Sequence, residues 1–585
     1  MRLKNLFFTF VSLLFVLNLS AQHFSESQFI KSNDKIYDSL KEQFAESEVL
    51  GFTQATPLSV SEMKFYFNQI EKDKLSSYGA SLYDDIYTQL YTQNDFMKML
   101  KVDTAFRFYL NPKINLELFT KSNELIPYSF NYFMEDFPLT LPILIGFDDF
   151  VTIETDLFIG KNSESIKRNP SFTNVLYEFN DFEFFFPKYA YGGFAKQFDN
   201  WGISFQIGRE GYQIGDTVLG SIIYNDTFES DCYTVLNFYS NIFRYSLDVI
   251  EASSNNMDSP NLVSGEGESK KRIYTQSSNS RFMYLHHFDF RLFKRFTFST
   301  IEGVFAAAPL DLRYLNPLCI MHQFGSFYEH NIPDDYIYQR ANESAYMCFM
   351  FEYVPVKDLR FYGLFAQNEH QTGSELTTDY GKSYPESIAI QLGGDYNLHL
   401  SAASKLKFNL ECLYNSPYMY IRHNPAASFY RFRVSQVNGQ DKSYSWVGSP
   451  YGPDCAGGQL SVSYVRNKKF SVNLEYLFLM HGEKDFDIFD EVTKGYYSYY
   501  PAVLFNLIKK DGGNVDDVIK DARSMVLSGT VEYNHSVALR GEYYILKNLK
   551  LGADLIYTLS LNCNHKENNT QHNVEAGLVF SYTIF

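Results

Sequence analysis

The sequence predicts an all-β, antiparallel transmembrane barrel of about 18 strands that follows a small N-terminal bundle of α-helices. Three observations predict this fold: an export signal, apolar residues at every second position along most of the chain, and an aromatic-rich composition. The chain holds 46 Tyr and 55 Phe, yet its mean hydropathy is negative. A barrel has this composition because an apolar, aromatic exterior is averaged with a polar lumen and polar loops.

The N-terminus has the features of a secretory signal peptide. Arg2 and Lys4 precede an apolar run at residues 6–17, and the small residue Ala21 follows. The run is too short to span a bilayer as a helix. We therefore predict that residues 1–21 are removed during export.

Residues 22–100 are predicted to form the helical bundle, on the periplasmic side of the membrane. Apolar residues recur at every fourth position in two stretches, which indicates helices with one apolar face: Ile36, Leu40 and Phe44, and then Leu82, Ile86 and Leu90. Between them, Ser59 and Glu62 have the spacing of a capping box, so a helix is predicted to start there and run to about Ile70. Each helix is too short to be stable alone, so the three must pack on one another or on the barrel mouth.

Residues 101–585 are predicted to form the barrel itself. In the segment 470–478 the apolar residues alternate with polar ones, and the segment 549–559 repeats the pattern. The apolar set of the first segment is Phe470, Val472, Leu474, Tyr476 and Phe478, and its polar set includes Ser471, Asn473 and Glu475. A period of two indicates strands with one apolar face. The segment 427–436 is interpreted as a further strand of the same wall.

The connections between these strands predict the orientation of the barrel. Short turns at 293–296, 466–469 and 546–549 are assigned to the periplasmic side, because barrels of this class keep their short turns there. Long connections are assigned to the cell exterior: 253–280, 325–343, 367–385 and 482–525. The last strand then ends on the side of the helical bundle. The alternative is a large soluble β-protein, but a propeller should repeat a motif about every 40 residues, and the sequence has no such repeat.

Charge and motifs exclude several classes of function. The formal net charge is −17, which argues against nucleic acid or another polyanion as the partner. Hydrolase, phosphate-loop and zinc-protease motifs are absent from the sequence, so we expect a non-enzymatic protein without cofactor or metal. The pair His286-His287 does not change this expectation, because neighbouring strand residues face opposite sides of a sheet. A serine hydrolase stays open as an alternative, since catalytic triads are set by geometry.

A segment from Trp201 to Cys232 carries the best candidate for ligand binding. Apolar residues at 203, 205 and 207 indicate a strand that ends near Arg209. The chain then continues with several glycines and with Tyr212, Asn225 and Asp226. An Arg beside glycines at a strand end can bind an anionic sugar through its planar fork of donors. The alternative is an Arg within a lumenal ladder of ion pairs.

A second candidate is the aromatic run at residues 496–500. Tyr497 and Tyr500 are the residues of this run that we assign to ligand binding. Aromatic faces offer apolar surface with a polar edge, which suits sugar rings. The alternatives are a loop that packs on itself and an aromatic girdle at the membrane surface.

The first segment also carries a resemblance to a known family. Gly208-Arg209, a turn from Gly211 to Gly215, and Asn225-Asp226 resemble the capsule-assembly outer-membrane proteins of the Wzi type, and so does the sequence Leu315-Asn316-Pro317 with His322. The chain departs from that family's pattern at Tyr212 and Ile214, where the glycine turn usually holds Trp.

This resemblance implies an outer-membrane protein that binds or retains capsular or other extracellular polysaccharide without catalysis. The expected partners are outer-membrane lipid, the polysaccharide, and the barrel-assembly machinery during insertion. The alternative function is a porin or another solute transport channel, because a barrel of this size has room for one.

Overall fold

The structure is a computed structural model. It describes residues 25–51, 53–91, 106–123, 125–126, 137–161, 173–174, 182–185, 189–226, 230–254, 262–264, 271–273, 280–318, 321, 343–370, 385–422, 427–434, 442–486, 520 and 523–583. The predicted signal peptide and the predicted boundary between residues 100 and 101 lie outside this set. Within it, the helices end at Tyr91 and the first wall strand begins at Phe106.

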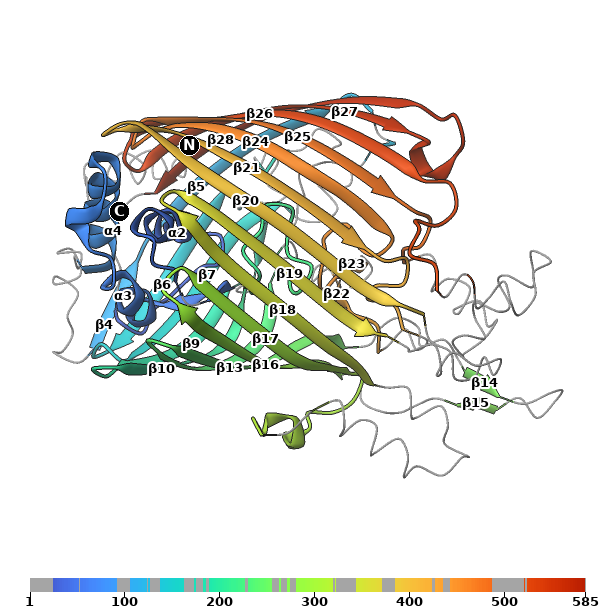
Figure 1. Cartoon of the computed structure of the whole chain (residues 1–585), viewed down its shortest axis with the longest axis horizontal. Coiled ribbons are helices and arrows are strands. Elements are labelled where there is room, and N and C mark those ends of the chain that lie inside the picture. Colours follow the sequence, from blue (N-terminus) through green and yellow to red (C-terminus); the bar gives the residue numbers. More distant parts are fainter. Residues whose placement is uncertain are drawn as a thin grey trace, which may run out of the picture.

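Twenty β-segments close into one antiparallel barrel of 18 strands, which confirms the predicted fold class (Figure 1). The two counts differ because two strands are each interrupted once. β4 (Phe106–Leu110) and β5 (Lys113–Lys121) follow one another along β6 (Leu139–Phe147). In the same way β8 (Phe182–Phe185) and β9 (Ala190–Gln197) follow one another along β7 (Val151–Lys161).

The remaining wall strands continue in chain order and return to β5. They are β10 (Trp201–Glu210), β12 (Asp231–Ser240), β13 (Phe243–Ser254), β16 (Ser280–Phe293), β17 (Phe296–Ala306), β18 (Glu343–Val356), β19 (Leu359–Glu369), β20 (Ser387–Ser401), β21 (Ser404–Asn415), β24 (Cys455–Arg466), β25 (Phe470–His481), β26 (Glu532–Leu546), β27 (Leu549–Leu561) and β28 (Gln571–Thr583). β28 pairs with β5, which closes the wall and leaves no open edge.

The predicted alternation of apolar and polar residues is confirmed on the wall. Leu474 of β25 is 51% exposed and Leu555 of β27 is 53% exposed, because both face outward from the barrel. Their polar neighbours Asn473 and Asp554 lie on the lumenal side. Water-soluble proteins rarely expose a continuous apolar surface of this kind, so this face is the one that contacts lipid.

Short turns gather at one end of the barrel, the short-turn mouth. They include all three predicted turns, which connect β16 to β17, β24 to β25, and β26 to β27. Three helices lie at this same mouth: α2 (Lys35–Ser47), α3 (Val60–Phe67) and α4 (Ser77–Tyr91) (Figure 1). The backbone amide of Leu50 donates to Lys294 O at 2.9 Å, and that of Asp358 donates to Ala45 O at 3.1 Å. The opposite end, where the long connections lie, is the long-loop mouth.

Helix α3 shows how local sequence sets its own start. Ser59 Oγ accepts from the Glu62 amide at 3.2 Å, so the predicted N-cap is confirmed. The Glu62 carboxylate does not return to the cap as a complete capping box would require. It accepts from Tyr66 at 2.8 Å and from a wall arginine, and the helix ends at Phe67 rather than Ile70. No helix among the described residues has the length and hydropathy needed to cross a membrane.

Short strands inside the barrel hold the chain that fills it. β1 (Phe29–Ile30) pairs with β3 (Leu58–Ser59), and β2 (Ala55–Thr56) pairs with β11 (Gln213–Ile214). β14 (Leu262–Ser264) pairs with β15 (Lys271–Ile273) beyond the long-loop mouth, outside the lumen (Figure 1). β22 (Tyr430–Val434) and β23 (Lys442–Trp446) form a hairpin inside the barrel. The assignment of 427–436 to the wall is therefore wrong. Its apolar and aromatic residues pack against the inner surface of the barrel instead.

Candidate functional site

The first part of the site is the N-terminal segment, which enters the lumen from the short-turn mouth. Arg244 of β13 donates through Nε to Glu62 Oε1 of α3 at 2.8 Å and through Nη2 to Asn237 Oδ1 at 2.9 Å. The amide of Phe29 donates to the Tyr191 hydroxyl at 3.0 Å, and Lys31 pairs with Asp156 of β7. These side chains are buried or nearly so, and the pairs attach the segment firmly to the wall.

A second network joins helix α2, the connection after β10, and the wall. Lys41 Nζ lies 2.6 Å from the Asp216 carboxylate, and Arg360 of β19 donates to the same carboxylate at 3.2 Å. Arg360 also donates to Asp395 at 2.9 Å. Burial alone would lower the pKa of Lys41, but the carboxylates of Asp216 and Asp38 outweigh burial and raise that pKa above its usual value. The lysine therefore stays charged inside the network.

From the long-loop mouth, two connections fold into the lumen and interlock. The Asn225 amide donates to Val447 O at 2.9 Å, and its side-chain Nδ2 donates to Trp446 O at 3.1 Å. Arg431 of the inserted hairpin donates to Asn225 O at 2.8 Å, to Asn225 Oδ1 at 2.9 Å, and to Asp231 Oδ2 at 2.9 Å. The side chains of Arg431 and Asp231 are 0% and 1% exposed. The buried Arg431 of one connection therefore binds both Asn225 of the other connection and Asp231 of strand β12.

An apolar core surrounds this junction inside the barrel. Residues of the inserted connections pack on inward-facing wall residues, and they share one hydrophobic cluster: Ile222, Ile223, Tyr420, Phe429 and Trp446 with Val235, Ile301 and Tyr346. The Tyr346 hydroxyl donates to Ile222 O at 3.0 Å, and the Tyr420 hydroxyl donates to the same oxygen at 2.7 Å. A lumen packed in this way excludes water from the middle of the barrel on this side.

The lumenal face of β25 to β27 is different, because its charged side chains are partly exposed. Arg540 is 37% exposed on its side chain, and it lies 3.2 Å from Glu475 and 3.9 Å from Asp554. Glu542 and Lys550 continue this charged face toward the short-turn mouth. Lys35 of α2 pairs with Glu542 at the short-turn end of this face. The described chain that fills the lumen, the plug, packs on the other part of the wall and leaves the charges around Arg540 partly accessible to water.

The structure separates the residues predicted for ligand binding. Tyr212 is buried between Tyr224 and Tyr233, with ring centroids 5.5 and 5.0 Å away. Asn225 is buried in the junction described above, and Asp226 accepts from Ser32 Oγ of the N-terminal segment at 3.0 Å. These three residues belong to the inserted connection after β10.

Arg209 does not join them. It pairs in register with Cys232, which is exposed on the outer face of β12, and its Nε donates to Ser230 Oγ at 2.8 Å. The alternation of 203, 205 and 207 places Arg209 on the same outward frame. Tyr497 and Tyr500 lie outside the described residues. The assignment of these side chains to ligand binding stays a prediction.

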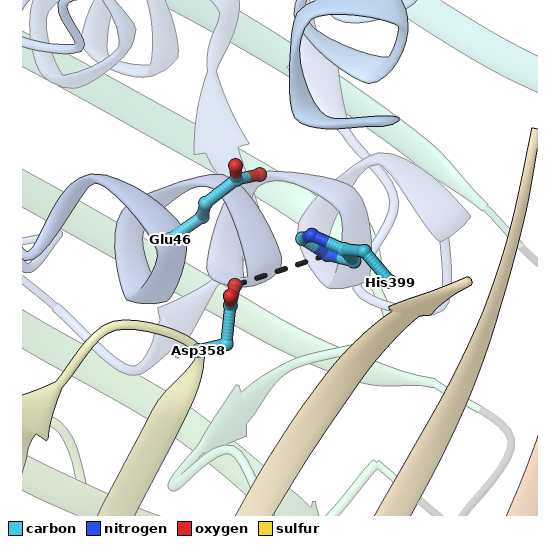
Figure 2. Close-up of side chains that lie close together, drawn as sticks. All are labelled: Glu46, Asp358 and His399. Atoms are coloured by element: carbon cyan, nitrogen blue, oxygen red, sulfur yellow. Dashed lines mark ion pairs between the residues drawn. The ribbon is translucent and has the colours of Figure 1, made fainter. Parts of the chain in front are cut away.

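A cluster that sequence reasoning missed lies at the short-turn mouth. Glu46 comes from α2, Asp358 from the turn between β18 and β19, and His399 from the end of β20 (Figure 2). One ligand atom of each lies within 4.8 Å of the other two. Burial raises the pKa of Asp358 to about 6, although His399 partly opposes this shift. No sequence spacing could reveal the cluster, because only closure of the barrel over α2 brings its members together.

Asp358 and His399 of this cluster, together with the nearby Ser76, have the residue types of a hydrolase triad but not its geometry. Ser76 Oγ lies 3.0 Å from His399 Nδ1, and Asp358 Oδ1 lies 3.8 Å from His399 Nε2. A triad has the serine on Nε2 and the acid on Nδ1, so the two ring nitrogens are exchanged here. Ser76 Oγ also accepts from the Gly79 amide at the start of α4 at 3.0 Å, which gives this hydroxyl a structural role as a helix cap.

Comparison with known proteins identifies the fold. No protein-family model matches the chain, and no curated protein matches it in sequence. Among solved structures the chain is similar to Wzi, a carbohydrate-binding β-barrel of the outer membrane involved in group 1 capsule assembly in Escherichia coli. The two are 11% identical, the alignment covers 95% of this chain and 99% of Wzi, and the TM-score is 0.54. The fold is that of Wzi.

The Wzi-like fold confirms the family resemblance predicted from the sequence at the level of architecture: the chain has the fold of an outer-membrane β-barrel. The chain is also similar to OprD of Pseudomonas aeruginosa, with 8% identity, coverage of 81% of this chain and 94% of OprD, and a TM-score of 0.37. That score is too low to carry an argument.

Proposed function

We propose that this Wzi-like barrel is a non-enzymatic outer-membrane protein that binds capsular or other extracellular polysaccharide at the cell surface. The observation that carries the proposal is the chain packed inside the lumen. Chain from both mouths fills the described lumen along β12 to β20, and buried pairs such as Arg431–Asp231 fix it there. The long-loop mouth and its rim are then the surface that we assign to the polymer. The carbohydrate binding of Wzi, which has the same fold, supports this choice of ligand.

The proposed orientation places the long-loop mouth outside the cell and the helices in the periplasm. Outer-membrane barrels keep short turns in the periplasm and long loops outside. All three helices lie at the short-turn mouth. The polysaccharide surface would then face the medium, where the polymer is.

Sugar binding at this surface would use aromatic faces and polar loop groups. Tyr497 and Tyr500 are the candidates that the sequence offers. Asp226 lies inside the barrel, where it accepts from Ser32 of the N-terminal segment. Tyr212 and Asn225 would act differently, because they are buried and would shape the loops rather than contact the sugar. Catalysis is not part of the proposal, since the serine of the Ser76–His399 pair caps a helix.

The direct test uses protein purified in detergent and polysaccharide extracted from the surface of its own source cells. We expect saturable binding, and no binding to dextran as an unrelated control polymer. Cells that lack the protein should still make the polysaccharide but shed it into the medium. Absence of binding together with normal retention on the mutant cells would overturn the proposal.

A second candidate function is a narrow solute channel, which one observation favours. The partly exposed charges Glu475, Arg540 and Asp554 line a lumenal face that the described plug does not cover. Recording in planar bilayers separates the two functions. Steady open steps from the wild-type protein would favour the channel, whereas a silent protein that retains polysaccharide would favour the first proposal.

A further inference from the structure

We propose that Glu42, Glu46, Asp358 and His399 bind a divalent transition-metal ion, of the class of Zn²⁺, at the short-turn mouth. The site is independent of the proposed polysaccharide function, because it lies at the other end of the barrel. Glu42 and Glu46 are one turn apart on α2. Figure 2 shows Glu46 with Asp358 and His399, which come from the wall. A bound ion would therefore join the helix to the barrel.

The first argument is that each of these side chains presents a buried atom without a partner. Glu42 Oε1, Glu46 Oε2, Asp358 Oδ1 and His399 Nε2 have no hydrogen-bond partner among the described residues. The Glu46 side chain is 0% exposed, and that of Glu42 is 8% exposed. A buried carboxylate oxygen without a partner is costly, and native proteins rarely keep one without an ion or water. Here His399 Nε2 lies beside two of these oxygens, Glu42 Oε1 and Asp358 Oδ1.

The second argument is that the other atom of three of these side chains is already fixed. Lys405 binds Glu42 Oε2, and Lys357 Nζ lies 3.1 Å from Glu46 Oε1, which also accepts from the Ser76 amide. Ser76 Oγ lies 3.0 Å from His399 Nδ1. Metal ligands are oriented in this way by partners on the atom that faces away from the ion. When Nδ1 donates to Ser76, Nε2 carries the lone pair that a metal needs.

The third argument is distance. His399 Nε2 lies 3.7 Å from Glu42 Oε1 and 3.8 Å from Asp358 Oδ1. Both distances are too long for a hydrogen bond. They are close to the roughly 3.4 Å that separates two ligands of a tetrahedral ion with bonds of about 2.1 Å. One ligand atom of Glu46 lies within 4.8 Å of one on Asp358 and one on His399. A bound ion would have to draw this carboxylate toward His399.

The donor types define the class of metal. Carboxylate oxygens with one imidazole suit Zn²⁺, Mn²⁺ or Fe²⁺. Ca²⁺ and Mg²⁺ are bound through oxygen, so His399 argues against them. A proton on Nε2 is the competing explanation, but one imidazolium proton cannot satisfy three separate carboxylate oxygens at these distances.

The test uses the full-length protein in detergent, stripped with EDTA, desalted, and exposed in turn to Zn²⁺, Mn²⁺ and Fe²⁺. We expect one equivalent of at least one of these ions per chain by elemental analysis. The double variant Asp358→Asn/His399→Ala should bind at least tenfold more weakly, and the matched control Asp73→Asn/His535→Ala should bind like the wild type. Asp73 is an exposed acid, and His535 lies on the lipid-facing side of β26.

X-ray absorption at the metal edge of the wild-type protein gives a readout that needs no variant to fold. We expect one imidazole nitrogen and otherwise oxygen ligands around the ion. Failure of the stripped wild type to bind any of the three ions, or equal binding by both double variants, would overturn the site. A spectrum without imidazole would do the same.

Discussion

Arg244 Nε lies 2.8 Å from Glu62 Oε1, and this ion pair joins wall strand β13 to helix α3 with side chains that are 2% and 0% exposed. Asp289 of β16 lies 3.5 Å from Nη1 of the same guanidinium, and Asn237 Oδ1 of β12 accepts a hydrogen bond from its Nη2. One arginine therefore binds the N-terminal segment to three neighbouring strands. Such a pair adds little net stability, but removal of one partner leaves the other charge buried.

We predict that Arg244→Met loosens α3 from the wall, because the buried Glu62 carboxylate then loses its guanidinium partner. The cost of breaking a buried pair is about 3 to 5 kcal/mol, which should appear as faster amide hydrogen exchange in residues 60–67. The double variant Glu62→Met/Arg244→Met should recover much of this protection. Lys72→Met, which breaks an exposed pair with Asp84, serves as control. Unchanged exchange in Arg244→Met would show that the pair does not hold the helix.

We predict that Arg431→Met opens the barrel on the long-loop side. The variant leaves the Asp231 carboxylate and the Asn225 side chain without the guanidinium that joins them, so the two inserted connections lose their shared tie to β12. In planar bilayers we expect brief conductance steps that the wild type lacks. Arg313→Ala is the control, because Arg313 is an exposed arginine whose ion pair with Asp311 lies outside the junction. Equal traces from both variants would contradict a sealing role for Arg431.

The sequence predicts the wall well and the contents of the lumen poorly, for a physical reason. Each wall residue faces either lipid or lumen, so alternation alone places Leu474 and Asn473. The Ser59 cap is also local, and its prediction is confirmed. The Arg431–Asp231 and Lys405–Glu42 pairs join segments far apart in the chain, and no period or spacing encodes them. Segment 427–436 has the composition of a wall strand because it too is surrounded by apolar groups, although these belong to protein rather than lipid.

The outward position of Arg209 could be predicted from the sequence. It continues the odd-numbered frame of Ile203, Phe205 and Ile207, which faces outward, so its place on the outer side of β10 follows from alternation. The cluster of Glu46, Asp358 and His399 could not be predicted from the sequence. Its members have no neighbouring ligand in the chain, and they meet only because α2 packs on the short-turn mouth.

Orientation in the membrane is tested by labelling with a maleimide that does not cross membranes. Tyr87 of α4 is 48% exposed and Val526 at the long-loop mouth is 75% exposed. We expect Val526→Cys to react in intact cells, and Tyr87→Cys to react only after the outer membrane is permeabilised. The parent protein controls for Cys232 and Cys412, which are exposed on the lipid-facing side of the wall. Reaction of Tyr87→Cys in intact cells would reverse the proposed orientation.

Polysaccharide binding should depend on the tyrosine run more than on Arg209. The Arg209 side chain lies on the outward frame with Ser230 as a partner, so we expect Arg209→Ala to change the affinity by no more than about twofold. Loss of two aromatic contacts, each contributing about 0.5 to 1.5 kcal/mol, should weaken binding about tenfold in Tyr497→Ala/Tyr500→Ala. Titration of each variant with polysaccharide from the source cells measures both effects. A large loss in Arg209→Ala with none in the tyrosine variant would place the sugar at the rim of β10, beside the outer leaflet, and would move the site away from the loops.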